Sequence, residues 1–269
     1  MRKRILTALL TVCLLTAVVP GANAVSLLVN GTTITNNVSL QNSTTYVPIR
    51  ATTLLLSPGA NISWENGQAV VRTSNLTIIA RPGNCYIEAN GRMLYVQDGV
   101  KLVNGTTLVP IRALAKALGA ASVTWDGNTQ KVTVKSGSGT IESGDKYYDS
   151  NSVYWLSRII NSESGGESLK GKIAVGNVIL NRVANPNYPN TIYDVIFDDK
   201  WGVQFQPISN GTIYNTPSEE SILAAKLCLD GASVAGNSLY FLNPSKASSF
   251  WIVQNCTFVT TIGNHSFYA

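Results

Sequence analysis

Two glutamates bracket a short turn in the C-terminal half of the chain. The segment Ser162-Glu-Ser-Gly-Gly-Glu167 separates two stretches, 153–161 and 169–183, whose apolar residues recur at helical spacing. Two adjacent glycines allow a tight, exposed corner between helices, so Glu163 is expected at a helix end, backed by the apolar second helix. A carboxyl held against apolar surface favours its protonated form, as a general acid near neutral pH requires. The alternative is an ordinary solvated glutamate at a helix end.

The chain offers few partners for a second catalytic group. His265 is the only histidine, which excludes a multi-histidine metal centre and leaves a histidine-based triad a single candidate base. The sequence therefore indicates no metal and no cofactor. The remaining acidic residues of this half fall in segments typical of solvated helix or loop: Asp194, Asp198, Asp199, Glu219, Glu220 and Asp230.

The N-terminus has the three-part pattern of a secretory signal peptide. The basic residues 2–4 precede the apolar run 5–19, and Ala22-Asn-Ala24 supplies small residues where a signal peptidase reads them. The run is shorter than the roughly 20 residues that span a membrane, and no later segment is long and apolar enough to do so. Residues 1–24 are therefore predicted to be cleaved, which makes the mature chain a secreted protein.

The charge and the cysteine content exclude further classes of protein. Removing residues 1–24 takes three basic and no acidic residues, which lowers the formal net charge from +5 to +2 and leaves no charge argument for nucleic-acid binding. Cys85, Cys228 and Cys256 have no metal-ligand or CxxC spacing. A Cys228–Cys256 disulfide and buried free thiols both stay open, and the oligomeric state is not indicated.

The N-terminal half contains an internal repeat. Asn42-Ser-Thr-Thr-Tyr-Val-Pro-Ile-Arg50 recurs as Asn104-Gly-Thr-Thr-Leu-Val-Pro-Ile-Arg112, and each copy runs on to a strand with one tryptophan, Trp64 or Trp125. Asn-Gly and Asp-Gly turns between β-rich runs indicate hairpins. A period of about 60 residues predicts two similar small subdomains. The two arginines are expected to tie a helix start to the neighbouring hairpin, with binding of wall carbohydrate as the alternative.

This repeated motif, followed by a tryptophan-acidic hairpin, resembles the copper amine oxidase N-terminal-like domain over roughly residues 25–135. The resemblance implies a non-catalytic adaptor attached to exported bacterial enzymes. Residues 25–135 contain no histidine, so they provide no copper site. The small, polar segment 136–146 is expected to be a flexible linker to a second domain at 147–269.

An ordered set of motifs in the C-terminal half resembles the spore-cortex-lytic type of cell wall hydrolase, the SleB/CwlJ family. The resemblance covers about 120 residues. This chain has Ser164 and Gly165 where many members have alanine and arginine, and its loop at Trp201-Gly202 also differs. The motifs are the turn at 162–167, Gly171-Lys-Ile-Ala-Val-Gly-Asn-Val-Ile-Leu-Asn-Arg-Val183, Thr191-Ile-Tyr-Asp-Val-Ile-Phe197, Gln204-Phe205, the helix 218–230 and Thr261-Ile-Gly-Asn-His-Ser-Phe-Tyr268.

The resemblance implies cleavage of the glycosidic bond between N-acetylmuramic acid and N-acetylglucosamine in peptidoglycan, at the cell wall or spore envelope. Glu163 takes the position of the family's catalytic glutamate. With one convincing acid, a lytic transglycosylase route is favoured, because one carboxyl then serves both proton transfers. A hydrolytic muramidase and a non-catalytic wall-binding protein are the alternatives. Whether the substrate is spore cortex or vegetative wall stays open.

Aromatic and amide side chains should line the cleft, because sugars present apolar faces edged with hydroxyls. Core packing is the alternative for the aromatics, a structural hydrogen bond for His265, and stabilisation of the following helix start for Glu167. The expected fold is α+β, with a duplicated β-rich (ββα-type) adaptor followed by a lysozyme-like, mainly helical domain with a small β element. The expected substrate-binding residues are Glu167, Gln204, Phe205, Tyr240, Asn264, His265 and Tyr268.

Overall fold

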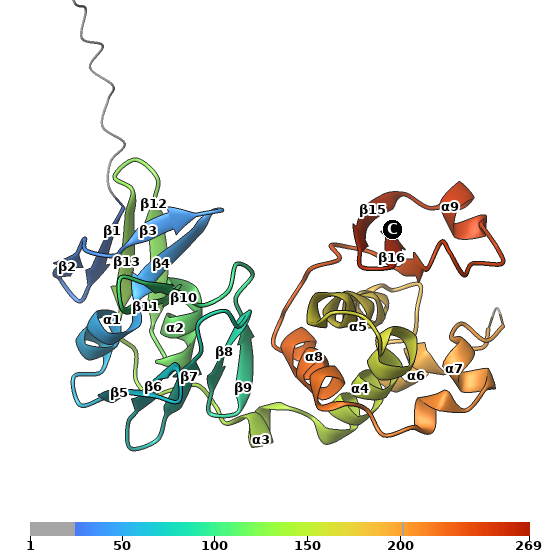
Figure 1. Cartoon of the computed structure of the whole chain (residues 1–269), viewed down its shortest axis with the longest axis horizontal. Coiled ribbons are helices and arrows are strands. Elements are labelled where there is room, and N and C mark those ends of the chain that lie inside the picture. The colour runs from blue at the N-terminus through green and yellow to red at the C-terminus, as the bar shows by residue number, and fades with distance from the viewer. Residues whose placement is uncertain (1–24, 201) are drawn as a thin grey trace, which may run out of the picture.

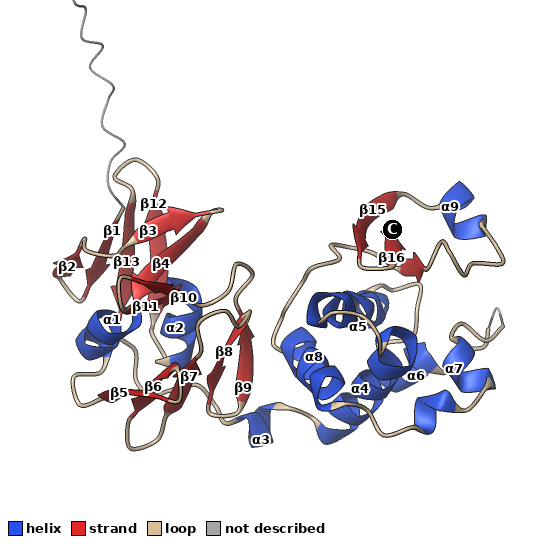
Figure 2. Ribbon diagram, viewed as in Figure 1, coloured by secondary structure: helices blue, strands red, loops and turns tan. Residues whose placement is uncertain are grey.

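The chain folds into a β-rich N-terminal lobe and a mainly helical C-terminal lobe, joined at the short helix α3 (Gly144–Tyr147) (Figure 1). The computed structural model describes residues 25–200 and 202–269, so the predicted signal peptide lies outside the described residues. The expected α+β fold class is confirmed, with helices and strands largely segregated between the lobes (Figure 2). Among the described residues, no helix has the length and apolarity to cross a membrane.

Each copy of the repeat forms three hairpins and one short helix. The helix begins at the isoleucine of the Val-Pro-Ile motif, directly after the proline that ends the preceding strand. The elements of the first copy are β1 (Ser26–Val29), β2 (Thr32–Ile34), β3 (Ser39–Gln41), β4 (Thr44–Pro48), α1 (Ile49–Leu56), β5 (Asn61–Glu65) and β6 (Gln68–Arg72). After β7 (Thr77–Ala80), those of the second are β8 (Tyr86–Ala89), β9 (Arg92–Tyr95), β10 (Lys101–Val103), β11 (Thr106–Pro110), α2 (Ile111–Ala117), β12 (Ser122–Asp126) and β13 (Lys131–Lys135).

The two copies interlock, so the two similar subdomains predicted from the repeat share their sheets and their core. Strand β1 of the first copy pairs in parallel with β13 of the second, while β5 and β6 join β8 and β9 through β7. At the centre β4 pairs with β11, so Val47 lies opposite Val109. Both copies contribute to one continuous apolar core from Leu27 to Ile141. A unit of this size buries too little apolar surface alone, and exchanging hairpins gives the pair a shared interior.

The repeated arginines tie each helix start to its neighbouring hairpin, as predicted. Arg50 donates from Nη2 to the carbonyl oxygen of Ile62 at 2.7 Å. Arg112 donates from Nη1 to the carbonyl oxygen of Val123 at 3.5 Å, which is the corresponding place in the second copy. These bonds fix the hairpins that carry Trp64 and Trp125, both of which stay partly exposed.

The C-terminal lobe packs three longer helices against shorter ones and a small sheet. The central helices α4, α5 and α8 contact each other pairwise and enclose a second apolar core. The sheet has the order β14-β16-β15 and lies over one end of this bundle (Figure 1). The elements are α4 (Ser150–Ser164), α5 (Leu169–Ala184), α6 (Ile192–Ile196), α7 (Gln206–Ser209), η1 (Thr212–Tyr214), α8 (Glu219–Leu229), β14 (Tyr240–Leu242), α9 (Trp251–Asn255), β15 (Phe258–Ile262) and β16 (His265–Tyr268).

A buried ion pair joins the two lobes at the end of α8. The carboxylate of Asp230 is fully buried and is bound by the guanidinium of Arg92 from β9, by Lys116 at 3.2 Å and by the hydroxyl of Tyr148. Burial raises the pKa of Asp230, but the hydrogen bonds from these groups bring it below its ordinary value. The expectation that Asp230 is solvated is therefore wrong, because its charged partners Arg92 and Lys116 reach it from the other lobe.

The segment expected to be a flexible linker is packed against the N-terminal lobe. Ile141 is buried in the N-terminal core, and the backbone N–H of Gly144 donates to the carbonyl of Asn90 at 2.8 Å. The domain boundaries themselves stay predictions. Of the open cysteine alternatives, the structure has free thiols at Cys85, Cys228 and Cys256, with Cys228 buried in the C-terminal core.

Candidate active site

Helix α4 places Glu163 at the start of the glycine turn. Its N-terminus is capped by Asp149, whose carboxylate accepts from the backbone N–H of Ser152 at 2.7 Å. One face is fully buried through Leu156, Ile159 and Ile160, and this anchors the helix against α5 and α8. Glu163 lies in the last turn, one residue before the helix ends. This is the position predicted from the sequence, in which the Glu163 carboxyl lies beside a turn and against apolar helices.

The carboxyl of Glu163 is half-buried and has no hydrogen bond or ion pair with any described residue. Burial alone raises its pKa from 4.5 to about 7. Desolvation disfavours the charged form, and no neighbouring cation offsets it. Near neutral pH Glu163 is therefore poised between a proton-donating and a proton-accepting state, which suits a general acid that must later act as a base.

Hydrogen bonds hold the residues on both sides of Glu163. The hydroxyl of Ser162 donates to the carbonyl of Thr212 in η1 at 3.0 Å. The hydroxyl of Ser164 donates back to the carbonyl of Ile160 at 2.6 Å and is buried. Serine is thus accommodated at the position where many relatives have alanine. The backbone that carries Glu163 is fixed while its carboxyl is left without a partner.

Glu167, at the other end of the turn, is fully engaged with the small sheet. Its carboxylate accepts from the backbone N–H of Asn264 at 3.2 Å and from Nδ2 of Asn264 at 2.8 Å. Hydrogen bonding by Asn264 lowers the pKa of Glu167 below its ordinary value. The N-cap of α5 is Ser168, whose hydroxyl accepts from the backbone N–H of Gly171, so Glu167 does not cap this helix. Glu167 instead ties the turn to the β15–β16 hairpin.

Glycines make room for this carboxylate. Gly263, in the β15–β16 turn, has a φ of +58°, and a Cβ there would lie 1.9 Å from Oε2 of Glu167. A Cβ on Gly171 in α5 would lie 2.8 Å from the Cβ of Glu167. Both positions therefore require glycine while Glu167 keeps its place. The turn, the second helix and the hairpin are fitted around one buried side chain.

His265 belongs to the same cluster but not to a proton-transfer pair with Glu163. It is buried, its Nδ1 lies 3.8 Å from Oε1 of Glu167, and that nitrogen has no hydrogen-bond partner among the described residues. Burial lowers the pKa of His265, although the nearby Glu167 opposes this. The ring packs edge-on against Phe241. Its contacts are those of a packed residue beside the Glu167 anchor.

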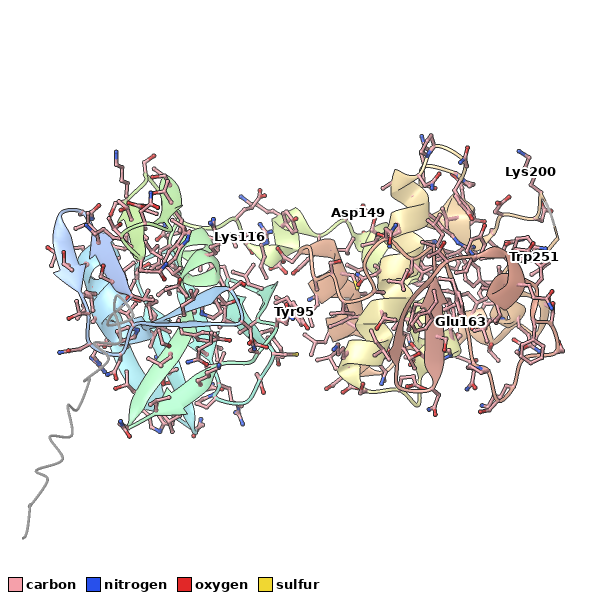
Figure 3. All side chains as sticks on the ribbon, turned by 90° about the horizontal axis from the view of Figure 1, so that it is seen from above. Tyr95, Lys116, Asp149, Glu163, Lys200 and Trp251 are labelled. Atoms are coloured by element: carbon pink, nitrogen blue, oxygen red, sulfur yellow. The ribbon has the colours of Figure 1, made fainter. Side chains whose placement is uncertain are left out.

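Two predicted substrate-binding residues line a shared cavity of about 890 Å³ in the C-terminal lobe. Gln204 is exposed and donates to the carbonyl of Gly202 at 2.8 Å. Tyr240 shares a hydrogen bond with the hydroxyl of Tyr188 at 2.9 Å. The described lining does not include Glu163. Figure 3 shows Glu163 within the lobe, and Lys200 and Trp251, which line the cavity, at its outer edge.

The remaining predicted residues have structural contacts. Phe205 is 3% exposed and lies in the C-terminal core, so the core-packing alternative holds for it and an open sugar-binding face does not. Tyr268 is also buried, opposite Tyr240 in the sheet. The side-chain amide of Asn264 donates its hydrogen bond to Glu167. None of these three presents a free side chain to a cleft in this structure.

Sequence reasoning missed two residues that line the cavity, Trp251 and Tyr188, and a third, Arg182, that packs behind it. Trp251 is 56% exposed, and its ring centroid lies 6.3 Å from that of Tyr240. Tyr188 lies in the segment Asn185-Pro-Asn-Tyr-Pro-Asn190 after α5, a composition that marks a turn. Arg182 is buried behind the cavity and donates from Nε to the carbonyl of Leu239 at 2.8 Å. The run Phe250-Trp-Ile-Val253 was the available signal, since exposed apolar residues often mark a binding surface.

Among the described residues of this lobe, no second carboxyl combines burial, a raised pKa and the absence of a hydrogen-bond partner. Glu220 pairs with the buried Lys172, and Asp194 accepts from the hydroxyl of Thr191 at 2.6 Å. Asp198 lines the cavity and accepts from the backbone N–H of Lys200 at 3.2 Å. Glu163 is the carboxyl of this lobe whose pKa is raised by burial without a compensating partner. Nor do three His, Cys, Asp or Glu side chains gather in the described regions to hold a metal.

Comparison with known proteins confirms both resemblances. Residues 166–268 match the Cell Wall Hydrolase family, and residues 28–134 match the copper amine oxidase N-terminal domain, with a further match at 100–154. The C-terminal half therefore contains a match to the cell wall hydrolase family, and the N-terminal lobe contains a match to the copper amine oxidase N-terminal domain. The family match begins three residues after Glu163.

Curated relatives of the C-terminal half are spore cortex-lytic enzymes. The one from Bacillus cereus is 37% identical over 120 residues, which are 45% of this chain and 45% of the relative. The one from Bacillus subtilis is 32% identical over 120 residues, or 38% of its own length. The chain thus spans less than half the length of these relatives. The solved catalytic domain of the germination-specific lytic transglycosylase SleB from Bacillus anthracis is 33% identical, with all of that domain and 48% of this chain aligned at a TM-score of 0.42.

Proposed function

We propose that this chain cleaves peptidoglycan glycan strands as a lytic transglycosylase, with Glu163 as its single catalytic acid and base. The observation that carries the proposal is the isolated, desolvated carboxyl of Glu163, whose pKa is raised to about 7. The cell wall hydrolase match and the spore cortex-lytic relatives support the substrate class. These relatives also favour spore cortex over vegetative wall as the substrate.

The reaction divides into two proton transfers at one carboxyl. Protonated Glu163 donates to the oxygen that links N-acetylmuramic acid to N-acetylglucosamine, and the bond from C1 of the muramoyl residue to that oxygen breaks. The resulting carboxylate then accepts the proton of the muramoyl 6-hydroxyl as its oxygen bonds to C1. The products are a 1,6-anhydromuramoyl end and a free N-acetylglucosamine hydroxyl. No water is consumed, so no second carboxylate is needed to activate one.

The cavity beside Gln204, Tyr240 and Trp251 is the proposed binding surface for the strand. Its volume of about 890 Å³ lies in the range of saccharide-sized sites. Aromatic rings at its rim match the apolar faces of sugars, and the hydroxyl pair of Tyr188 and Tyr240 matches their edges. We assign Glu167, Asn264 and His265 to holding the turn that carries Glu163. The protein would act at the cell wall or spore envelope after loss of residues 1–24.

Mass spectrometry of digestion products tests this reaction. The chain from Val25 to Ala269 is incubated with purified peptidoglycan, and the released fragments are weighed. A transglycosylase gives 1,6-anhydromuramoyl ends, which are lighter by one water than reducing ends. Reducing ends alone would replace the proposal with a hydrolytic muramidase. Absence of release by the wild-type chain, under conditions where it stays folded, would leave a wall-binding protein.

A further inference from the structure

The N-terminal lobe contains a cavity of about 560 Å³ that its repeat motifs build together. One wall is the first copy's hairpin at Leu40, and another is the segment after β9, beginning at Tyr95. The opposite wall is the start of α2 at Arg112 and the strand β12 up to Trp125. The volume falls in the range of small-ligand pockets. The cavity therefore exists only because the two copies interlock.

Its lining combines apolar faces with one cation. Leu40 is 41% exposed and Trp125 is 38% exposed, so both are apolar residues held at the surface rather than in the core. The pairing of Trp125 with Val132 across β12 and β13 fixes the strand that carries the ring. A fixed, exposed indole beside a hollow is suited to stacking on the apolar face of a sugar ring.

Arg112 supplies the charge. Its guanidinium makes one long hydrogen bond, to the carbonyl of Val123 at 3.5 Å, and has no acidic partner among the described residues. It is exposed and lines the cavity. An exposed guanidinium without an acidic partner can bind a carboxylate through two parallel hydrogen bonds. The cavity is thus complementary to a ligand that carries both a sugar face and a carboxylate.

The cavity shares one residue with the contact between the lobes. Tyr95 lines it and also packs against the C-terminal core, and Figure 3 shows Tyr95 on the side of the N-terminal lobe that faces its neighbour. The same strand, β9, carries Arg92, which forms the buried ion pair with Asp230. A ligand bound here is therefore held at a fixed place relative to the C-terminal lobe.

We propose that this cavity binds an N-acetylmuramic acid unit of a glycan strand from which the stem peptide has been removed, with its sugar face against Trp125 and its freed lactyl carboxylate on Arg112. This proposal rests on peptidoglycan as the substrate and assigns a second, non-catalytic contact to it. The N-terminal lobe then holds the polymer while the C-terminal lobe cleaves it. The corresponding residues of the first copy, Arg50 and Trp64, do not line the cavity and provide matched controls.

Binding is measured by titration calorimetry with the chain from Val25 to Ala269 carrying Glu163→Gln, so that the ligand is not consumed. The ligands are peptide-free glycan oligosaccharide, N-acetylmuramic acid and N-acetylglucosamine. We expect Arg112→Ala and Trp125→Ala each to weaken oligosaccharide binding about tenfold or more, since one charge-assisted hydrogen bond or stacked ring contributes that much. Arg50→Ala and Trp64→Ala should leave it unchanged. N-acetylmuramic acid should bind better than N-acetylglucosamine, and Arg112→Ala should abolish the difference.

Amide hydrogen exchange locates the ligand independently of affinity. Bound oligosaccharide should slow exchange in residues 122–126 of the parent but not of Arg112→Gln, a variant that keeps much of the side-chain volume. Unchanged affinity in both cavity variants, or equal loss in the Arg50 and Trp64 controls, overturns the proposal. So does equal binding of the two monosaccharides. Cleavage of the oligosaccharide by the Glu163→Gln parent, seen by chromatography after titration, would instead overturn the catalytic assignment and leave the cavity result standing.

Discussion

The two glutamates of one turn have opposite environments. Glu163 has no polar partner among the described residues and its pKa rises to about 7, whereas Glu167 accepts two hydrogen bonds from Asn264 and its pKa falls. Only four positions separate them. The difference arises from what faces each carboxyl, since apolar helices surround one and a hairpin turn with free N–H donors meets the other.

The contrast indicates different roles for the two carboxyls, proton transfer for Glu163 and structural support for Glu167. A carboxyl that must give and take a proton needs to be free of strong hydrogen bonds, and Glu163 fits that requirement. A carboxyl that holds structure needs as many donors as possible, and Glu167 has them. The turn Ser162-Glu-Ser-Gly-Gly-Glu167 therefore places the proposed catalytic carboxyl four residues before the carboxylate that anchors the turn. Substitutions at the two ends should consequently fail in different ways.

The largest effect is expected for Glu163→Gln. The amide keeps the shape of the side chain but removes the proton that the leaving oxygen needs, so turnover should fall by about 10²–10⁴-fold. Release of soluble muropeptides from purified peptidoglycan measures this, with sedimentation binding to insoluble wall as the control for folding and recognition. A variant that keeps wild-type turnover would remove Glu163 from the reaction, and a dead Glu167→Gln beside it would move the acid to the other end of the turn.

The next effect concerns the fit around Glu167. Gly263→Ala adds a Cβ that overlaps the Glu167 carboxylate and forces alanine to a φ of +58°. We expect a loss of about 2–4 kcal/mol in the free energy of unfolding, from left-handed strain and overpacking together. Gly211→Ala is the control, since Gly211 also has a positive φ but no atom near its Cβ position. Equal losses in the two variants would show that Glu167 is not held where we describe it.

Stability should also depend on pH through Glu163. Its pKa is higher in the folded chain than the ordinary 4.5, so stability is greatest below pH 4.5 and falls as pH rises through about 7. The full shift corresponds to at most about 3 kcal/mol. Glu163→Gln removes this loss and should be more stable than wild type at pH 8 but similar to it at pH 4. Urea unfolding at both pH values measures the difference, and parallel stabilities would contradict the desolvated state of Glu163.

The smallest effect is expected for Glu167→Gln. The amide keeps an acceptor for Asn264 but loses the charge that strengthens it, which should cost about 1–2 kcal/mol of stability at pH 7. Because the pKa of Glu167 is lowered in the folded chain, the wild-type advantage should disappear as pH falls through that pKa. Activity should drop less than in Glu163→Gln. Thermal unfolding and muropeptide release on the same samples separate the two readouts.

Local pattern predicted much of the fold and part of the site. The apolar spacing of 153–161 and 169–183 predicted α4 and α5, and the glycine pair between them placed Glu163 at a helix end. The repeated motif predicted both short helices and the arginine contacts. These features depend on residues close in sequence, so spacing and turn chemistry suffice to find them.

Contacts between segments that are distant in the chain could not be predicted from the sequence. The partner of Glu167 is Asn264, 97 residues away, and that of Asp230 is Arg92, 138 residues away. Hairpin exchange between the repeats likewise depends on strand pairings that no local pattern specifies. Phe205 and Tyr268 were expected at the site but are buried, because an aromatic residue alone does not show whether its face is covered. Predicting such contacts and such burial requires the tertiary structure.

The pH dependence of kcat/KM for the wild-type chain tests the central claim most directly. If Glu163 is the acid and burial keeps it protonated near neutrality, kcat/KM on soluble glycan strands should decline as pH rises above about 7, approaching tenfold per pH unit. The decline should follow a single ionisation whose midpoint lies near the pKa of Glu163. A profile that stays flat to pH 9, or that falls with a midpoint near the ordinary 4.5, would contradict the account.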